Sequence, residues 1–145
     1  MPDTYADTSV LFALLHPGDE FFHTVNQRRR KTGAHFFYPP WLRYELRHTL
    51  RLARTNAAGE TAWRALLAAE SNTLHGLTVD LLGQLQRADK LSEVNSRQLG
   101  FVGAGDVLHL ASALHLAADE FWTCDRAQAD WARAVGLKVV EFEPD

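Results

Sequence analysis

The apolar residues of this chain fall into short runs separated by longer amphipathic stretches. The short runs are rich in aromatic and β-branched residues and are bounded by turn residues, a pattern typical of strands. This pattern predicts strands at 4–7, 34–38, 73–77, 120–124 and 137–142. The run at 73–77 is the weakest of these predictions.

The longer stretches repeat their apolar residues at helical spacing. They predict helices at 9–15, 19–32, 41–57, 60–70, 79–94 and 126–135, and one more that begins near Asp106. We expect Thr8 or Ser9 to cap the first helix, because hydroxyl side chains satisfy free amides at helix starts. Gly59 is expected to separate 41–57 from 60–70.

Strands that alternate with helices indicate right-handed crossovers and a parallel sheet. Such a sheet is covered on both faces, so the fold class expected is α/β, as a three-layer α/β/α sandwich with a central parallel sheet. A length of 145 residues, of which 46% are hydrophobic, suits one domain over 1–145.

Composition narrows the possible functions. No stretch approaches the ~20 apolar residues of a membrane span, and the first residues lack the pattern of a signal peptide, so we expect a cytoplasmic protein. Cys124 is the only cysteine, which excludes an internal disulfide and a cysteine metal site. The net charge of −3 argues weakly against a nucleic-acid binder that uses its whole surface.

Two acids follow predicted strands. Asp7 closes the first strand and Asp125 follows the strand at 120–124. Parallel strands end at the same edge of a sheet, and ligands bind outside the carboxyl ends of such strands. We therefore expect both carboxylates at one edge.

Two further acids lie on inward faces of predicted helices. At 100° per residue, Asp106 aligns with the small apolar residues Leu110, Ala113 and Ala117. Glu45 shares its face with a second apolar set, which consists of Leu42, Thr49, Leu52 and Ala53. The arginines of the same helix cluster on the opposite side, at Arg43, Arg47, Arg51 and Arg54.

Each acid also has a simpler interpretation as a turn or capping residue. However, four carboxylates in one cleft repel one another unless a cation neutralises them or their pKa values rise. A bound metal resolves this conflict. Ligation by Asp and Glu oxygens alone suits Mg²⁺ or Mn²⁺ and disfavours zinc.

Four segments carry a resemblance to a known family. They are YADTSVLFALL, the glutamate of WLRYELRHTL, GDVLHLASAL and TCDRAQADWARAVGLKVV, and together they span nearly the whole chain. The sequence resembles PIN-domain nucleases, and within them the VapC-type ribonuclease toxins of toxin–antitoxin modules. The resemblance maps the acidic quartet of the family onto Asp7, Glu45, Asp106 and Asp125, as catalytic residues and metal ligands. Thr8, Ser9 and Thr123 are their polar neighbours.

The resemblance implies hydrolysis of RNA phosphodiester bonds with Mg²⁺ or Mn²⁺ as cofactor, leaving a 5′-phosphate and a 3′-hydroxyl. It also implies a homodimer and a cognate antitoxin, for whose apolar segment Phe21, Phe22, Trp41 and Leu42 are candidate contacts. The runner-up hypothesis is a catalytically inert PIN-like module that binds RNA or protein. Metal-dependent cleavage of RNA, abolished by EDTA, discriminates the two.

Two groups of residues are given weaker roles. The chain has 15 Lys and Arg against 18 Asp and Glu, so setting the four acids aside leaves a slightly basic remainder. The run Arg28–Lys31 or the arginine stripe on 41–57 could meet phosphates, although a solvated helix face is the more common explanation. His109, three residues after Asp106, could touch a ligand or a water, but a packing residue of its helix is the preferred interpretation.

Overall fold

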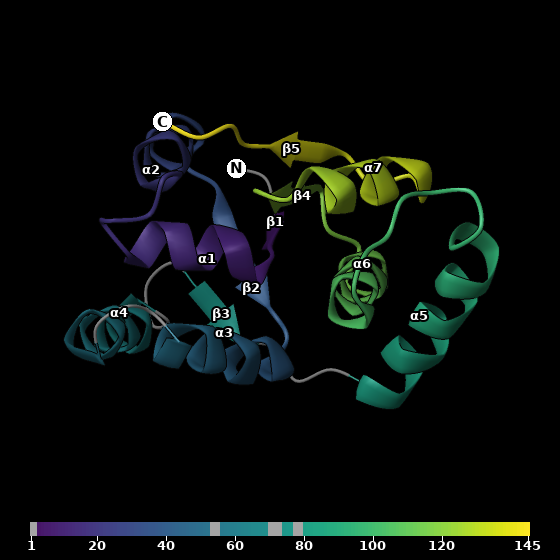
Figure 1. Cartoon of the computed structure of the whole chain (residues 1–145), viewed down its shortest axis with the longest axis horizontal. Helices are drawn as coiled ribbons and strands as arrows, with labels where there is room; N and C mark the ends of the chain where they lie inside the picture. Colours follow the sequence, from purple (N-terminus) through teal and green to yellow (C-terminus); the bar gives the residue numbers. More distant parts are fainter. Residues whose placement is uncertain (1–2, 53–55, 70–73, 77–79) are drawn as a thin grey trace.

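The computed structural model describes residues 3–52, 56–69, 74–76 and 80–145. Five short strands alternate with seven helices in these ranges (Figure 1). The strands are β1 Asp3–Ala6, β2 His35–Tyr38, β3 Leu74–Gly76, β4 Glu120–Thr123 and β5 Val139–Glu141. The helices are α1 Thr8–Leu15, α2 Phe22–Thr32, α3 Pro40–Leu52, α4 Asn56–Ala69, α5 Leu81–Asn95, α6 Ala104–His115 and α7 Arg126–Ala134.

All five strands are parallel, in the order β3-β2-β1-β4-β5. This confirms the predicted fold class; the outer residues of the predicted strand 73–77 lie outside the described ranges. From β1 the chain builds the sheet first toward β2 and β3, and then returns to add β4 and β5 on the other side. The direction of winding therefore reverses between β1 and β4, which is where sheets of this kind bind ligands.

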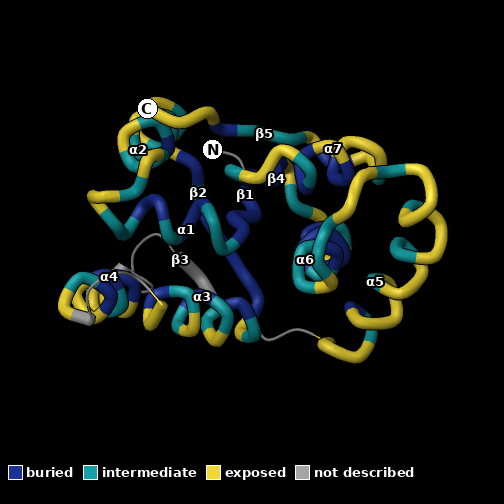
Figure 2. The backbone as a smooth tube through the Cα atoms, viewed as in Figure 1, coloured by how far each residue is buried: buried dark blue, intermediate teal, exposed yellow. Residues whose placement is uncertain are grey.

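Alternating side chains of the strands fill the two layers above and below the sheet. Tyr5 is fully buried and lies edge-on to His109 of α6, with the ring centroids 5.8 Å apart. Phe36 of β2, next to the residue in register with Tyr5, points to the opposite face. It packs against Trp122, and Arg29 of α2 lies over its ring. The buried strands therefore have helices on both faces, as the three-layer prediction requires (Figure 2).

Helix α5 has a different character. It lies beside α6 at the outer side of the molecule, where Figure 2 shows most of its tube exposed. Leu82 and Val94 on this helix are more than half exposed, as is Phe101 in the loop that follows. No helix within the described ranges is long and apolar enough to cross a membrane.

Two local predictions were wrong. The N-cap of α1 is Asp7, whose side chain accepts a hydrogen bond from the Val10 amide, and not Thr8 or Ser9. Gly59 does not separate two helices, because it lies inside α4. A Cβ at this position would meet the carbonyl oxygen of Leu50, so the glycine allows α4 to approach α3 closely.

Candidate active site

The candidate site lies at the carboxyl ends of β1 and β4, where the winding of the sheet reverses. The backbone amide of Asp7 donates to the Trp122 carbonyl at 3.2 Å, which extends the pairing of the two strands. The hydroxyl of Thr123, the last residue of β4, donates to Asp7 Oδ2 at 2.8 Å. Asp7 therefore sits directly between the two strand ends.

Asp7 is buried, with 3% of its surface exposed. Its Oδ1 atom accepts hydrogen bonds from the Ser9 hydroxyl at 2.6 Å and the Val10 amide at 3.0 Å. Burial raises the pKa of this carboxyl above its ordinary value, because the positive charge of His109 and the hydrogen bonds only partly offset the loss of hydration. The negative charge of Asp7 thus costs free energy in the absence of a cation.

Asp125 and Asp106 each lie at the N-terminal end of a helix, at this edge of the sheet. Asp125 is the N-cap of α7, and its Oδ1 accepts from the Gln128 amide at 2.9 Å. Asp106 is the third residue of α6, and its Oδ2 accepts from the amide of the N-cap residue Gly103 at 3.0 Å. The simple capping interpretation of these acids is therefore correct for one oxygen of each.

The pKa of Asp106 shows that capping is only part of its environment. Burial raises the pKa above its ordinary value, and the nearby charges of Asp125 and Glu45 raise it further. The hydrogen bond from Gly103 and the charge of His109 act in the opposite direction without reversing the shift. The three acids therefore lie close enough to repel one another.

Glu45 reaches the same edge from α3. Its Oε2 atom lies 2.6 Å from His109 Nε2 and also accepts a hydrogen bond from the Thr8 hydroxyl. Burial tends to raise its pKa, but the hydrogen bond and charge of His109, with the hydrogen bond from Thr8, lower it overall. The pKa values of Glu45 and Asp106 are therefore shifted in opposite directions.

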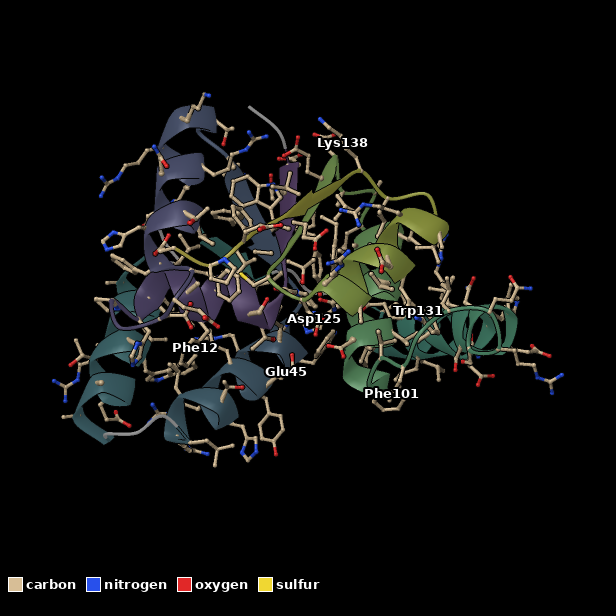
Figure 3. All side chains as sticks on the ribbon, turned by 45° about the horizontal axis from the view of Figure 1, so that its top comes forward. Phe12, Glu45, Phe101, Asp125, Trp131 and Lys138 are labelled. Atoms are coloured by element: carbon tan, nitrogen blue, oxygen red, sulfur yellow. The ribbon has the colours of Figure 1, made fainter. Side chains whose placement is uncertain are left out.

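A pocket of about 440 Å³ opens over two of these acids, Glu45 and Asp125, whereas Asp7 and Asp106 do not line it. Glu45 and Asp125 face the same region in Figure 3, with Phe12 of α1 beside them. The remaining lining residues are Thr8, Ser9, Asp19, Phe21, Thr49 and Cys124. None of the lining residues is a lysine or an arginine, so the wall combines acids with hydroxyl and aromatic groups. Burial raises the pKa of the Cys124 thiol to about 12, which keeps it from serving as a thiolate ligand.

The hydrogen bonds divide the carboxylates of the half-buried Glu45 and Asp106 and of the exposed Asp125 into a held oxygen and a remaining one. Across the described ranges, no hydrogen bond uses Oε1 of Glu45, Oδ1 of Asp106 or Oδ2 of Asp125. No three Asp, Glu, His or Cys side chains of this part of the chain already form a metal cluster. The chemistry of the donor set nevertheless fits Mg²⁺ or Mn²⁺, which take carboxylate oxygens and water.

His109 is the site residue whose role the sequence analysis ranked too low. It was interpreted as a packing residue, and its ring does pack against Trp41, with centroids 4.6 Å apart. Yet it also bonds Glu45, and its other nitrogen lies 2.9 Å from the Tyr5 hydroxyl. The available signal was its position one turn after Asp106, on the face already expected to turn toward the site.

Several predicted neighbours lie elsewhere. Leu52, assigned to the face of Glu45, is 73% exposed, because the buried residues of α3 follow the 42, 46 and 50 positions. Ala117, assigned to the face of Asp106, lies beyond the end of α6 with a positive φ of 52°. Leu42, a candidate antitoxin contact, is fully buried, and Trp41 donates to Gln84 of α5. Ala53 lies outside the described residues.

The arginine stripe is partly structural. Arg47 lies over the Trp63 ring at 4.9 Å and pairs with Glu60 at 2.7 Å, so it joins α3 to α4. Arg43 also approaches Trp63, at 6.0 Å. Arg51 is exposed, and Arg54 lies outside the described residues. The stripe is therefore less free to meet phosphates than the helical pattern predicted.

A doubly wound parallel sheet with clustered carboxylates at its switch point defines a class of α/β proteins with an acidic site. The PIN domain family model matches residues 4–134. The chain belongs to the PIN domain family, which confirms the resemblance read from the sequence. No curated protein sequence matches the chain significantly.

Solved structures share the fold over nearly the whole chain. Mycobacterium tuberculosis VapC20, described as a toxin that cleaves the sarcin–ricin loop, has a TM-score of 0.70 at 16% identity, covering 92% of this chain and 95% of that one. VapBC2 of Rickettsia felis, bound to a promoter DNA fragment, has a TM-score of 0.68 at 11% identity, with coverages of 97% and 99%. VapBC-1 of nontypeable Haemophilus influenzae has a TM-score of 0.67 at 15% identity, with coverages of 96% and 97%. At sequence identities this low, the structural likeness shows a shared fold alone.

Proposed function

We propose that this protein is a metal-dependent endoribonuclease and the toxin of a type II toxin–antitoxin pair. The observation that carries the proposal is the set of three acids at the switch point, each with one oxygen held and one remaining. Asp7 beneath them adds a fourth carboxylate, whose charge is unfavourable without a cation. The shared fold with VapC20, a toxin that cleaves the sarcin–ricin loop, supports RNA as the substrate class.

In this proposal Asp7, Glu45, Asp106 and Asp125 hold one or two Mg²⁺ or Mn²⁺ ions. Bound there, the metal lowers the pKa of a water molecule and stabilises charge on the phosphoryl and leaving oxygens. The capping contacts of Asp106 and Asp125 orient their carboxylates before metal binds, since each is fixed by a backbone amide. Thr8 and Ser9 also line the pocket, and their hydroxyls donate to Glu45 and Asp7, so in this proposal they hold the carboxylates.

The same comparison supports a proposal about partners. Two of the similar solved structures are VapBC structures, and we propose a cognate antitoxin and a second copy of this chain as partners here. Of the contacts expected from sequence, Phe21 lines the pocket and is half-buried, so it stays a candidate. Leu42 is no longer a candidate antitoxin contact, because it is buried in the core.

The test is cleavage of total RNA by the purified protein with Mn²⁺ or Mg²⁺, followed by sequencing of the new 5′ ends. We expect discrete cuts that carry 5′-phosphates and disappear with EDTA. An inert module leaves the RNA intact under every metal condition. Cleavage that persists in EDTA would instead mean that the acids act without metal, and both results contradict the proposal.

A further inference from the structure

A buried histidine lies directly behind Glu45. His109 has 1% of its surface exposed, and its Nε2 atom lies 2.6 Å from Glu45 Oε2. Its Nδ1 atom lies 2.9 Å from the Tyr5 hydroxyl, and the ring packs against Trp41. Both nitrogens and one face of the ring are therefore engaged, so the ring has a fixed orientation relative to Glu45.

The Tyr5 hydroxyl keeps a hydrogen of His109 on the nitrogen that faces Glu45. Tyr5 is fully buried, and its hydroxyl lies 2.9 Å from Nδ1 of the ring. A neutral ring that accepts from this hydroxyl at Nδ1 has its hydrogen on Nε2, and a protonated ring has hydrogens on both nitrogens. In either form Nε2 donates to Glu45 Oε2.

The same contact determines which oxygen of Glu45 is presented to the site. Oε2 accepts from both His109 and Thr8. Oε1 is turned toward the first turn of α6, because a Cβ built on Gly105 would lie 3.1 Å from it. Asp106 is the next residue of that turn. Glu45 therefore directs a single oxygen toward the turn that carries Asp106.

We propose that His109 and Tyr5 are positioning residues, which hold Glu45 through Oε2 so that Oε1 alone is available to a cation. This inference rests on the proposed metal site. His109 touches neither the cation nor the RNA in this arrangement and acts only through Glu45. Hydrogen-bond partners of metal ligands commonly fix ligand orientation, and losing one costs about 10–100-fold in metal affinity or activity.

A pair of variants separates positioning from packing. His109→Leu keeps an apolar side chain against Trp41 but removes the donor, whereas His109→Gln keeps a side-chain amide donor near the place of Nε2. Mn²⁺ affinity is measured by titration calorimetry on the full chain without RNA. We expect about 10-fold weaker binding in His109→Leu and recovery of most of that loss in His109→Gln. RNA cleavage should follow the same order, with kcat reduced and KM changed little.

The control is Trp131→Phe on α7. Trp131 is buried and its indole donates to the Gly100 carbonyl at 2.7 Å, so this change removes a buried hydrogen bond away from Glu45. We expect a lower melting temperature with unchanged Mn²⁺ affinity. If His109→Leu does not fold, Tyr5→Phe tests the same chain by removing only the hydroxyl, with an expected loss of severalfold in affinity.

Equal Mn²⁺ affinity in the wild type, His109→Leu and Tyr5→Phe would overturn the positioning role, as would equal losses in His109→Leu and His109→Gln. A wild type that binds Mn²⁺ but cleaves no RNA would refute the nuclease proposal, while the calorimetry still decides the role of His109. A wild type that binds no Mn²⁺ would overturn both proposals.

Discussion

Carboxylates removed from water have different surroundings at the two ends of β4. At the start of the strand, Glu120 is 5% exposed and is neutralised within the chain: Lys138 lies 2.7 Å away, and the Trp122 indole donates at 2.9 Å. Burial tends to raise the pKa of Glu120, but Lys138 and Trp122 lower it overall. At the other end, burial raises the pKa values of Asp7 and Asp106.

The two ends of β4 differ in the cationic side chains that lie beside their carboxylates. Among the ion pairs of the described residues, none joins a lysine or arginine to any of the four acids at the carboxyl end. His109 is the basic side chain that contacts them, and it bonds one oxygen of Glu45. The buried Glu120 has a lysine beside it. Clustered acids without a lysine or arginine partner are what a cation site requires before its ion binds.

The largest effect that separates the two ends is on catalysis. We expect Asp106→Asn and Asp125→Asn each to lower RNA cleavage at least ~100-fold, because each removes a charged metal ligand. Glu120→Gln should leave cleavage per folded molecule within about twofold. Initial rates with saturating Mn²⁺ measure this, with a melting curve for each variant as a folding check. Near-wild-type turnover in Asp106→Asn would contradict the assignment of the site.

Metal binding should distinguish the same two positions through stability. A ligand that binds only the folded state stabilises it by about 2.7 kcal/mol at 100 times its Kd. We expect wild type and Glu120→Gln to show the same rise in melting temperature with millimolar Mn²⁺. Asp106→Asn should lose most of that rise. Equal responses in all three proteins would mean that Asp106 only caps α6.

Breaking the internal pair at Glu120 is expected to be a smaller and purely structural effect. Lys138→Met keeps much of the aliphatic stem but removes the charge that neutralises Glu120. Lys138 is 73% exposed, so water partly replaces it, and we expect a loss of about 1–2 kcal/mol in the free energy of unfolding at neutral pH. Urea unfolding with and without Mn²⁺ measures this loss. A Mn²⁺ response smaller than that of the wild type would show that the two ends are not independent.

Much of the fold and of the acidic site could be predicted from the sequence, because these features depend on the local pattern of residues. The alternation of short apolar runs and helical stretches predicted all five strands and the layered fold. Asp7 and Asp125 were found because each directly follows a strand, and Asp106 and Glu45 because each lies on an inward helical face. Strand ends and helical faces are fixed by the chain within a few residues.

The side-chain pairs around these acids could not be predicted from the sequence, because they depend on tertiary contacts. Glu120 and Lys138 meet only when β5 lies beside β4. His109 and Glu45 are 64 residues apart and meet through the packing of α6 against the sheet. Gly59 appeared to be a helix breaker because glycine is unfavourable within helices, but close contact with α3 outweighs that preference.

The smallest expected effect is on the pH dependence of stability, which should change in opposite directions for substitutions at Asp106 and Glu120. Thermal unfolding in EDTA measures it. The pKa of Asp106 is raised from its ordinary 3.8 in the folded state, so the stability it contributes is present below that value and is lost as pH rises through the folded pKa. Asp106→Asn should therefore gain stability relative to wild type as pH rises from about 4 to 7. Because Asp106 is half-exposed, water screens the effect, and we expect a gain of roughly 1–3 °C.

Glu120 has the opposite linkage. Its folded pKa lies below the ordinary 4.5, so its stabilising contribution is present above that value and is lost as pH falls through the folded pKa. Glu120→Gln should be less stable than wild type at neutral pH, and the gap should close toward acid pH. Because the two acids lie at opposite ends of β4, the double variant should show the sum of the two effects. Matching signs in the two single variants would mean that Asp106 is stabilised within the chain as Glu120 is, which would remove the physical reason for a cation at the carboxyl end of the sheet.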